Sequence, residues 1–242
     1  MARIDIPGLV SGEYVDEARF ATRFKPFREW HPARDMEAEI ADIVIAARPD
    51  RVLEVGCGMG HFAQRLHERA NGFEFSYEAI DQSSRMVDVT RARGFTASVG
   101  DAQALAYPDA SFDVVVANWM LYHLPRLDDG IAEFARVLRP GGMLVAATMG
   151  LNMHAELWDT VDAGDATPEL SFHADNGEEL LAPHFASVER VDLSGETVFP
   201  DRNAVVEYVR STLTRGHLAA QIPQFDGSLT ARTTNAVFIA RR

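Results

Sequence analysis

The sequence predicts an α/β fold, in which helices cover both faces of a sheet of mostly parallel strands. Short apolar, β-branched runs alternate with segments of helical periodicity, and polar residues or glycines end each run. One such run leads directly into a glycine-rich loop and then into a helix. In open parallel sheets, ligands bind where the carboxyl ends of the strands meet such loops. The alternation therefore predicts both the fold class and the edge of the sheet that binds a ligand.

Strands and helices follow one another through the middle of the chain. We expect buried strands at residues 51–55, 77–80, 96–99, 112–117 and 142–148. We expect helices after the first, second and fourth of these strands, at residues 62–70, 83–93 and 127–138. The sequence Arg139-Pro140-Gly141-Gly142 is typical of the end of a helix. Right-handed crossover connections would place the helices on both faces of the sheet.

We divide the chain into three parts of one domain. Residues 1–50 form a helical N-terminal flank or lid, with an amphipathic helix at 35–47. Residues 51–150 form the ligand-binding core, and residues 151–242 shape the substrate pocket and supply the closing strands. In this last part the alternation weakens, and we expect helices at 153–161, 178–181 and 203–213 and strands at 188–193 and 236–240.

Charge and hydropathy exclude several classes of protein. With 23 Lys and Arg against 36 Asp and Glu, the chain has a formal net charge of −13. This charge argues against a nucleic-acid binder, because such proteins neutralise phosphates with clustered basic residues. The longest apolar stretches reach about half of the ~20 residues that a membrane-spanning helix needs. An acid and a proline interrupt the N-terminus where a signal peptide would be apolar, so we expect a cytoplasmic protein, as a monomer or a homodimer.

Two scarce residue types limit the chemistry. Cys57 is the one cysteine, which excludes an intrachain disulfide and a cysteine-rich zinc site. Lys25 is the one lysine, with no glycine loop nearby, which excludes pyridoxal enzymes and P-loop nucleotidases. The eight histidines show no HxxxH or HxH spacing, so no metal site is predicted.

The most specific motif is the glycine loop after the first core strand. Gly56, Gly58 and Gly60 stand at alternate positions between this strand and the next helix. Glycines let the backbone turn sharply and approach a ligand without a Cβ in the way. A dinucleotide-binding loop would have its third glycine one position later, where this chain has His61. The spacing therefore favours a ligand without a pyrophosphate.

Two acids follow the next two strands. Asp81 ends the second strand, at the offset of about 20 residues from the glycines where ribose-binding acids occur. Asp101 follows the third strand, and together with Ala102 it is placed to receive the amino group and ring of an adenine. The two acids and the glycine loop predict an adenosine pocket.

These motifs, in this order, resemble those of the class I S-adenosylmethionine-dependent methyltransferases, in particular the small-molecule branch similar to the ubiquinone and menaquinone biosynthesis methyltransferases. The resemblance covers about residues 50–150 and includes the segments 112–118 and 136–142. It implies a Rossmann-like sheet of seven strands with the last strand antiparallel, S-adenosylmethionine as the cofactor, and a small-molecule methyl acceptor.

The resemblance also implies which residues contact the cofactor. The methionine part would lie on the glycine loop, which Glu54 would orient, against Gly56, Cys57, Gly58 and Gly60. The adenosine would contact residues that follow the next two strands, Asp81, Gln82, Met86, Asp101 and Ala102. Asn118 would meet the amino-acid end, Trp119 would lead into the acceptor cavity, and Tyr14 would close the site from the N-terminal flank.

Methyl transfer needs an acceptor atom in line with the methyl group, and positioning alone supplies much of the acceleration. If the acceptor is a hydroxyl or an acidic carbon, a base must take its proton, and a histidine has a suitable pKa. His123, after the fourth core strand, is the first candidate base, and His154 and His173 are the alternatives. Each of the three fits a capping or packing role as well.

The sequence thus predicts a methyltransferase that acts on an O, N or C atom of a small molecule and releases S-adenosylhomocysteine. Two alternatives stay open: a non-catalytic S-adenosylmethionine-binding partner subunit, and an NAD-dependent oxidoreductase, which His61 disfavours. Aromatic residues in the two flanks fit a partly apolar acceptor and fit core packing equally well.

Overall fold

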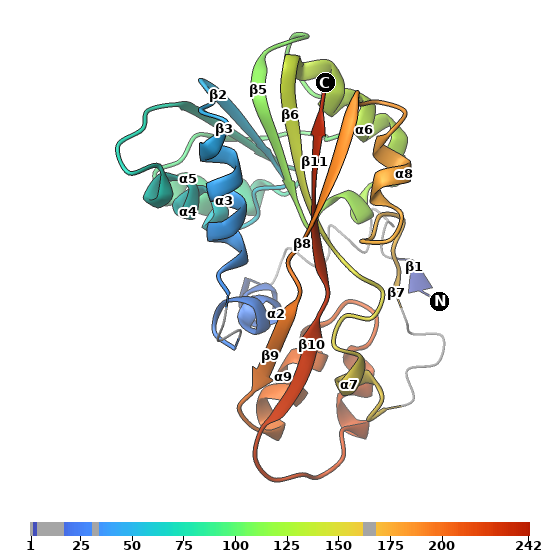
Figure 1. Ribbon diagram of the computed structural model, residues 1–242. Helices are drawn as coiled ribbons and strands as arrows, with labels where there is room; N and C mark the ends of the chain where they lie inside the picture. Colours follow the sequence, from blue (N-terminus) through green and yellow to red (C-terminus); the bar gives the residue numbers. More distant parts are fainter. Residues whose placement is uncertain (1, 4–16, 31–33, 162–167) are drawn as a thin grey trace.

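A seven-stranded sheet forms the centre of the computed structural model, which describes residues 2–3, 17–30, 34–161 and 168–242 (Figure 1). The strand order is β4-β3-β2-β5-β6-β11-β8. The strands are β2 (Arg51–Val55), β3 (Ser76–Asp81), β4 (Ala97–Val99), β5 (Phe112–Asn118), β6 (Leu138–Met149), β8 (Ser187–Asp192) and β11 (Asn235–Arg241). β11 runs antiparallel to β6 and β8, while the pairs among β2 to β6 are parallel. The predicted sheet, with its last strand antiparallel, is confirmed.

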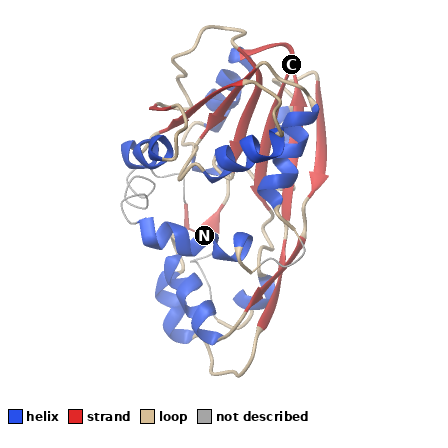
Figure 2. Cartoon of the chain, turned by 90° about the vertical axis from the view of Figure 1, so that its left-hand side faces the viewer, coloured by secondary structure: helices blue, strands red, loops and turns tan. Residues whose placement is uncertain are grey.

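Helices cover both faces of this sheet, as predicted (Figure 2). One face packs against α3 (Met36–Ala46), α4 (His61–Ala70) and α5 (Ser84–Ala92). The other face packs against α6 (Leu127–Val137) and α8 (Gly177–Leu181). Successive strand residues alternate between the faces, so that Val114 packs on the first face and Val115 on the second. The central strands are therefore apolar at nearly every position, which is why their boundaries were readable in the sequence.

Two predicted boundaries are wrong. β6 begins at Leu138 and not at residue 142, because α6 ends directly in the strand and Arg139 is held there by an ion pair of 2.7 Å with Asp113. The predicted helix at 153–161 is reduced to the short α7 (Ala155–Trp158), which begins after His154, a residue with left-handed backbone angles.

Below the sheet lies a second group of elements that the sequence did not predict as a unit. β9 (Gly195–Phe199) and β10 (Leu229–Thr233) form an antiparallel pair that extends the β8 and β11 ribbon downward (Figure 1). Around this pair lie α2 (Glu17–Arg28), α7, α9 (Arg202–Ser211) and the 3₁₀ helix η3 (Gly216–Gln221). We call these elements the accessory unit, which has a hydrophobic cluster of its own.

The N-terminal flank is divided between the two parts of the molecule. α2 packs against α9 and β9 of the accessory unit, whereas α3 packs against α4 on the sheet. The two-residue strand β1 (Ala2–Arg3) pairs with β7 (Pro168–Glu169). α3 begins with the side chain of Asp35, which accepts a hydrogen bond from the Ala38 N–H at 3.0 Å.

Candidate functional site

A cavity of about 730 Å³ lies between the carboxyl ends of β2, β3 and β5 and the accessory unit. This volume falls within the range typical of small-molecule sites. Its lining comes from the loops after these strands, from α2, from residues 149–158, and from residues 208–215 after and within α9. The cavity therefore has one end on the core sheet and the other on the accessory unit.

The glycine loop lines the core end of the cavity. Gly56, Gly58 and Gly60 all have left-handed φ angles, of 78°, 52° and 73°, which side chains disfavour. The N–H groups of Gly56 and Cys57 donate to the Ile80 carbonyl at 2.8 and 3.1 Å. These bonds attach the loop to the end of β3, and a Cβ on Gly56 would lie 3.0 Å from Met120. The loop thus presents bare backbone to the cavity at Gly56.

Asp81 also holds this loop. Its side chain is buried, its Oδ2 accepts the Gly58 N–H at 2.9 Å, and its Oδ1 accepts the Ser83 N–H at 2.9 Å. Burial raises the pKa of the Asp81 carboxyl above its ordinary value, while the two N–H donors oppose the shift. Each oxygen keeps a lone pair for a ligand, because a carboxylate has about four acceptor sites. Asp101 is exposed and lines the cavity as well.

Glu54 lines the cavity from below the loop and is only 2% exposed. Its carboxylate accepts a hydrogen bond from the Tyr77 hydroxyl, whereas the loop amides bond to Ile80 and Asp81. Among the described residues, the bonds that attach the loop amides to β3 thus come from Ile80 and Asp81, and an orienting role of Glu54 stays a prediction. Burial raises the pKa of Glu54 to about 8. Burial also raises the pKa of the Cys57 thiol, which fits a packing role for that residue.

Asn118 ends β5 at the cavity, and both polar atoms of its amide are buried without a hydrogen-bond partner among the described residues. A buried amide left unpaired costs free energy, so an unpaired amide on a residue of the cavity wall is suited to a polar ligand group. Trp119 follows with a left-handed φ of 51°, and its indole N–H donates to Asn235 Oδ1 at 3.1 Å. His123, in the 3₁₀ helix η1 (Leu121–His123), lines the cavity together with Tyr122.

Most of the predicted cofactor residues thus meet in one cavity, whose lining includes Glu54, Gly56, Cys57, Gly58, Asp81, Gln82, Asp101, Ala102, Asn118 and Trp119. Gly60 and Met86 are outside the lining. Gly60 begins α4, and a Cβ there would lie 3.0 Å from the Thr90 hydroxyl, so its close contact is with α5. Met86 is a fully buried residue of α5. Tyr14 lies outside the described residues.

The structure places two of the three predicted histidines, His154 and His173, outside the lining of the cavity. His154 is fully buried in the accessory unit, with its Nδ1 3.2 Å from the Tyr208 hydroxyl and its Nε2 3.1 Å from the Thr197 hydroxyl. Both ring nitrogens of His154 thereby have hydrogen-bond partners. His173 belongs to a turn in which its Nδ1 accepts the Asp175 N–H at 3.2 Å. Neither His154 nor His173 is among the residues that line the cavity.

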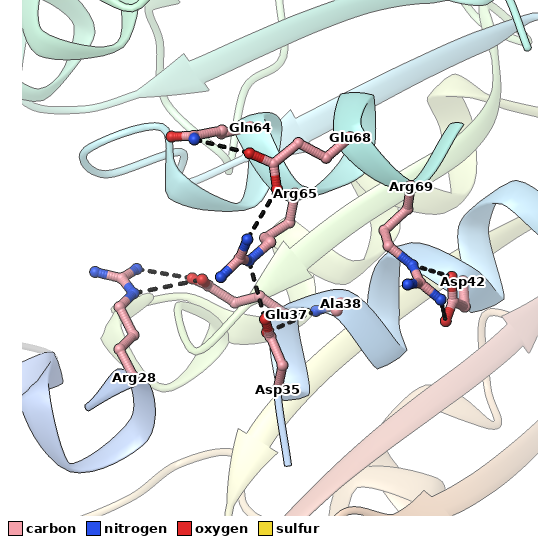
Figure 3. A network of polar contacts seen from close by, with 9 residues as sticks. All are labelled: Arg28, Asp35, Glu37, Ala38, Asp42, Gln64, Arg65, Glu68 and Arg69. Carbon is pink, nitrogen blue, oxygen red and sulfur yellow. Dashed lines mark hydrogen bonds and ion pairs between the residues drawn. The ribbon is translucent and has the colours of Figure 1, made fainter. Parts of the chain in front are cut away.

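The sequence reasoning missed two groups of cavity residues. Ion pairs between α2, α3 and α4 form one side of its rim (Figure 3). Among them, Arg28 lies 2.7 Å from Glu37, and Arg65 lies 3.0 Å from Asp35. Charged residues on amphipathic helices gave no signal that separated these pairs from ordinary surface charges. The second group comes from α7, α9 and the turn after α9.

The described ranges contain neither a candidate metal site nor a candidate membrane-spanning helix. No group of three or more His, Cys, Asp or Glu side chains there is arranged to hold a metal ion. No helix of these ranges has the length and apolar character needed to cross a membrane.

Comparison with known proteins agrees with this geometry. Residues 53–146 match the family of methyltransferase domains. A malonyl-[acyl-carrier protein] O-methyltransferase of Methylococcus capsulatus is 34% identical over 148 residues, which are 58% of this chain and 53% of the relative. A ubiquinone biosynthesis O-methyltransferase of an Azoarcus species is 29% identical over 195 residues, covering 74% of this chain and 80% of the relative. The chain spans about half the length of the first curated relatives that it matches.

Solved structures share the fold. The N-methyltransferase NodS of Bradyrhizobium japonicum, in complex with S-adenosyl-L-homocysteine, superposes with a TM-score of 0.59 at 17% identity, over 96% of this chain and 98% of that one. The residues of the domain match include the glycine loop, both acids and Asn118. The chain therefore contains a methyltransferase domain, at residues 53–146, on the fold of the S-adenosylmethionine-dependent methyltransferases.

Proposed function

We propose that this chain is an enzyme that transfers a methyl group from S-adenosylmethionine to an O, N or C atom of a small-molecule acceptor and releases S-adenosylhomocysteine. One observation carries the proposal: the glycine loop, Asp81 and the unpaired amide of Asn118 converge on the core end of a cavity that continues into the accessory unit. Such a cavity has room for a cofactor at one end and an acceptor at the other.

The residues present fit this cofactor. The unpaired Asn118 amide is suited to the polar amino-acid end, and the bare backbone at Gly56 permits close approach. Asp81 would accept the ribose hydroxyls through its remaining lone pairs. Asp101 and Ala102 would take the adenine. When bound, S-adenosylmethionine supplies a methyl group on a positively charged sulfur.

The chain's own contribution to the reaction is positioning and proton transfer. Trp119 and Met120 line the cavity beside the loop and would orient the acceptor toward the cofactor end. Where the acceptor loses a proton, His123 would take it, because it lines the cavity close to Trp119 in the chain. His61 also lines the cavity, but burial lowers its pKa to about 4, which makes it the weaker base. Acceptors that carry a free lone pair need no such base.

Calorimetry with S-adenosylhomocysteine and, in parallel, with NAD tests the proposal. We expect one-to-one binding of S-adenosylhomocysteine alone. Asp81→Ala should weaken this binding at least tenfold, or about 1.4 kcal/mol. Asp88→Ala, which removes an exposed acid from the neighbouring α5, is the matched control and should bind as the unchanged chain does.

Binding of NAD, or of neither compound, would overturn the proposal. Transfer of a labelled methyl group to acceptors tests turnover. Stoichiometric cofactor binding without transfer to any acceptor would instead identify a non-catalytic binding subunit. We further propose a small-molecule acceptor and not a nucleic acid, because the net charge of −13 repels phosphate backbones.

A further inference from the structure

The accessory end of the cavity contains a buried arginine that has no counter-charge among the described residues. Arg215, in the turn after α9, lines the cavity and is 9% exposed. Its Nε is buried without a hydrogen-bond partner, and no described residue forms an ion pair with its guanidinium. The guanidinium carbon lies 4.1 Å from the centre of the Trp158 ring. Burial lowers the pKa of Arg215 below its ordinary value.

The other arginines of the cavity rim differ from Arg215. Arg28 and Arg34 form ion pairs of 2.7 and 2.6 Å with Glu37 and Glu39 (the first drawn in Figure 3). Arg65 is paired as well. The chain carries 36 acidic residues. No acidic residue that the structure describes forms an ion pair with Arg215. A buried charge without a partner is costly, so its retention at a cavity wall indicates that a ligand supplies the partner.

The surroundings of Arg215 define the rest of that ligand. The lining from residues 149–215 includes no Asp or Glu among the described residues, whereas the acids of the cavity lie on its core end and rim. The hydroxyl of Tyr208, another lining residue, interacts with both Arg215 and Arg23, and each of these cations opposes the rise that burial causes in the pKa of Tyr208. The same cavity is also lined by apolar side chains, namely Phe24, Met149, Met153, Trp158, Leu170 and Leu213.

We propose that Arg215 binds an anionic group, a carboxylate or a phosphate, on an acceptor whose remaining body is apolar. The guanidinium offers several N–H donors in a planar fork, which matches both anions. The proposal rests on the proposed methyl transfer, and it names the acceptor class: an amphipathic acid. Arg215 is a binding and specificity residue in this scheme, and the Trp158 ring holds its guanidinium in place.

Titration of simple amphiphiles into the full chain tests this assignment. Octanoate, octyl phosphate and the neutral octanamide are titrated by calorimetry, both with saturating S-adenosylhomocysteine and without it. We expect octanoate or octyl phosphate to bind at least tenfold more tightly than octanamide, and the tighter of the two acids identifies the head group. Arg215→Gln should abolish this preference. Arg210→Gln, an equal charge change at an exposed position of α9, should retain it.

Thermal unfolding without ligand separates binding from a structural role. Removal of an uncompensated buried charge should leave the melting temperature unchanged or raise it. Arg215→Lys keeps a cation beside Trp158 without the planar fork, and should bind the acids more weakly than the unchanged chain. Equal binding of octanoate, octyl phosphate and octanamide, no saturable binding of either acid, or an unaltered preference in Arg215→Gln would each overturn the proposal. A chain that does not bind S-adenosylhomocysteine overturns the proposed function alone, because the titrations without it still measure the anion site.

Discussion

Glu54 makes the stability of this chain depend on pH in an unusual direction. Its carboxyl is buried beneath the glycine loop, and burial raises its pKa from 4.5 to about 8. Between these two values the folded chain keeps the proton, while the unfolded chain releases it. Each pH unit in this window then lowers the free energy of unfolding by about 1.4 kcal/mol, and the whole window by at most about 5 kcal/mol. The stability that Glu54 contributes is complete below the lower pKa and is lost as the pH rises through the higher one.

Glu54→Gln should remove this pH dependence. The amide has nearly the shape of the protonated acid, and its oxygen still accepts the hydrogen bond from the Tyr77 hydroxyl. Urea unfolding followed by tryptophan fluorescence gives the free energies of both proteins from about pH 5 to about pH 8. We expect the variant to gain stability over the unchanged chain as the pH rises, by up to about 1.4 kcal/mol for each pH unit.

A difference that stays constant across this range would refute the reasoning, because it would mean that Glu54 titrates alike in the folded and unfolded chains. The difference between two proteins also cancels the contributions of all other groups. Glu74→Gln, at an exposed position before β3, is the control and should give a flat difference. The cofactor is omitted from these measurements, since its binding would add its own stabilisation.

Three further predictions concern the glycine loop, His123 and His154. Gly56→Ala should lower the free energy of unfolding by about 2 kcal/mol, from left-handed strain and the close contact with the next loop, and should weaken S-adenosylhomocysteine binding in calorimetry. Gly72→Ala has a similar φ of +86° with open space around it, so it should lose about 1 kcal/mol and no affinity. His123→Gln should reduce turnover about 100-fold on an acceptor that loses a proton and flatten the pH profile of kcat/KM. His154→Phe should cost about 2 kcal/mol of stability and leave that profile unmoved, and a shifted profile would return His154 to the reaction.

The sequence was sufficient for the core sheet because its elements are defined by their own residues. β2 and β5 are apolar runs that end in glycine or polar residues, and each pairs with neighbours in the parallel order that crossover helices enforce. β9 and β10 gave no such signal. Their residues alternate between more buried and more exposed positions, and the two strands pair although 29 residues separate Phe199 from Leu229 in the chain. The pairing of strands so far apart in the chain depends on the packing of α9, which lies between them in the sequence. No local sequence pattern encodes this packing.

The same distinction explains which half of the cavity was predicted. The core end is built from residues that follow consecutive strands, so that Gly58 and Asp81, one strand apart, meet through a single hydrogen bond. The accessory end joins α2, α7 and the turn after α9, which come together only in the folded chain. Arg215 has no sequence feature that separates it from the other arginines, because its burial and lack of a partner are properties of its surroundings.

This division has a consequence for acceptor recognition. The acids that line the cavity lie at its core end and rim, while the lining from the accessory unit carries arginines and no acid among the described residues. An amphipathic acid would therefore be repelled from the cofactor's adenosine pocket and attracted to Arg215, which fixes its orientation before any contact at the reacting atom. Orientation of this kind reduces the entropy that the transfer step must otherwise overcome. A change of the acceptor's charged group would then require changes around Arg215, while the glycine loop and Asp81, which we propose bind the cofactor, could stay the same.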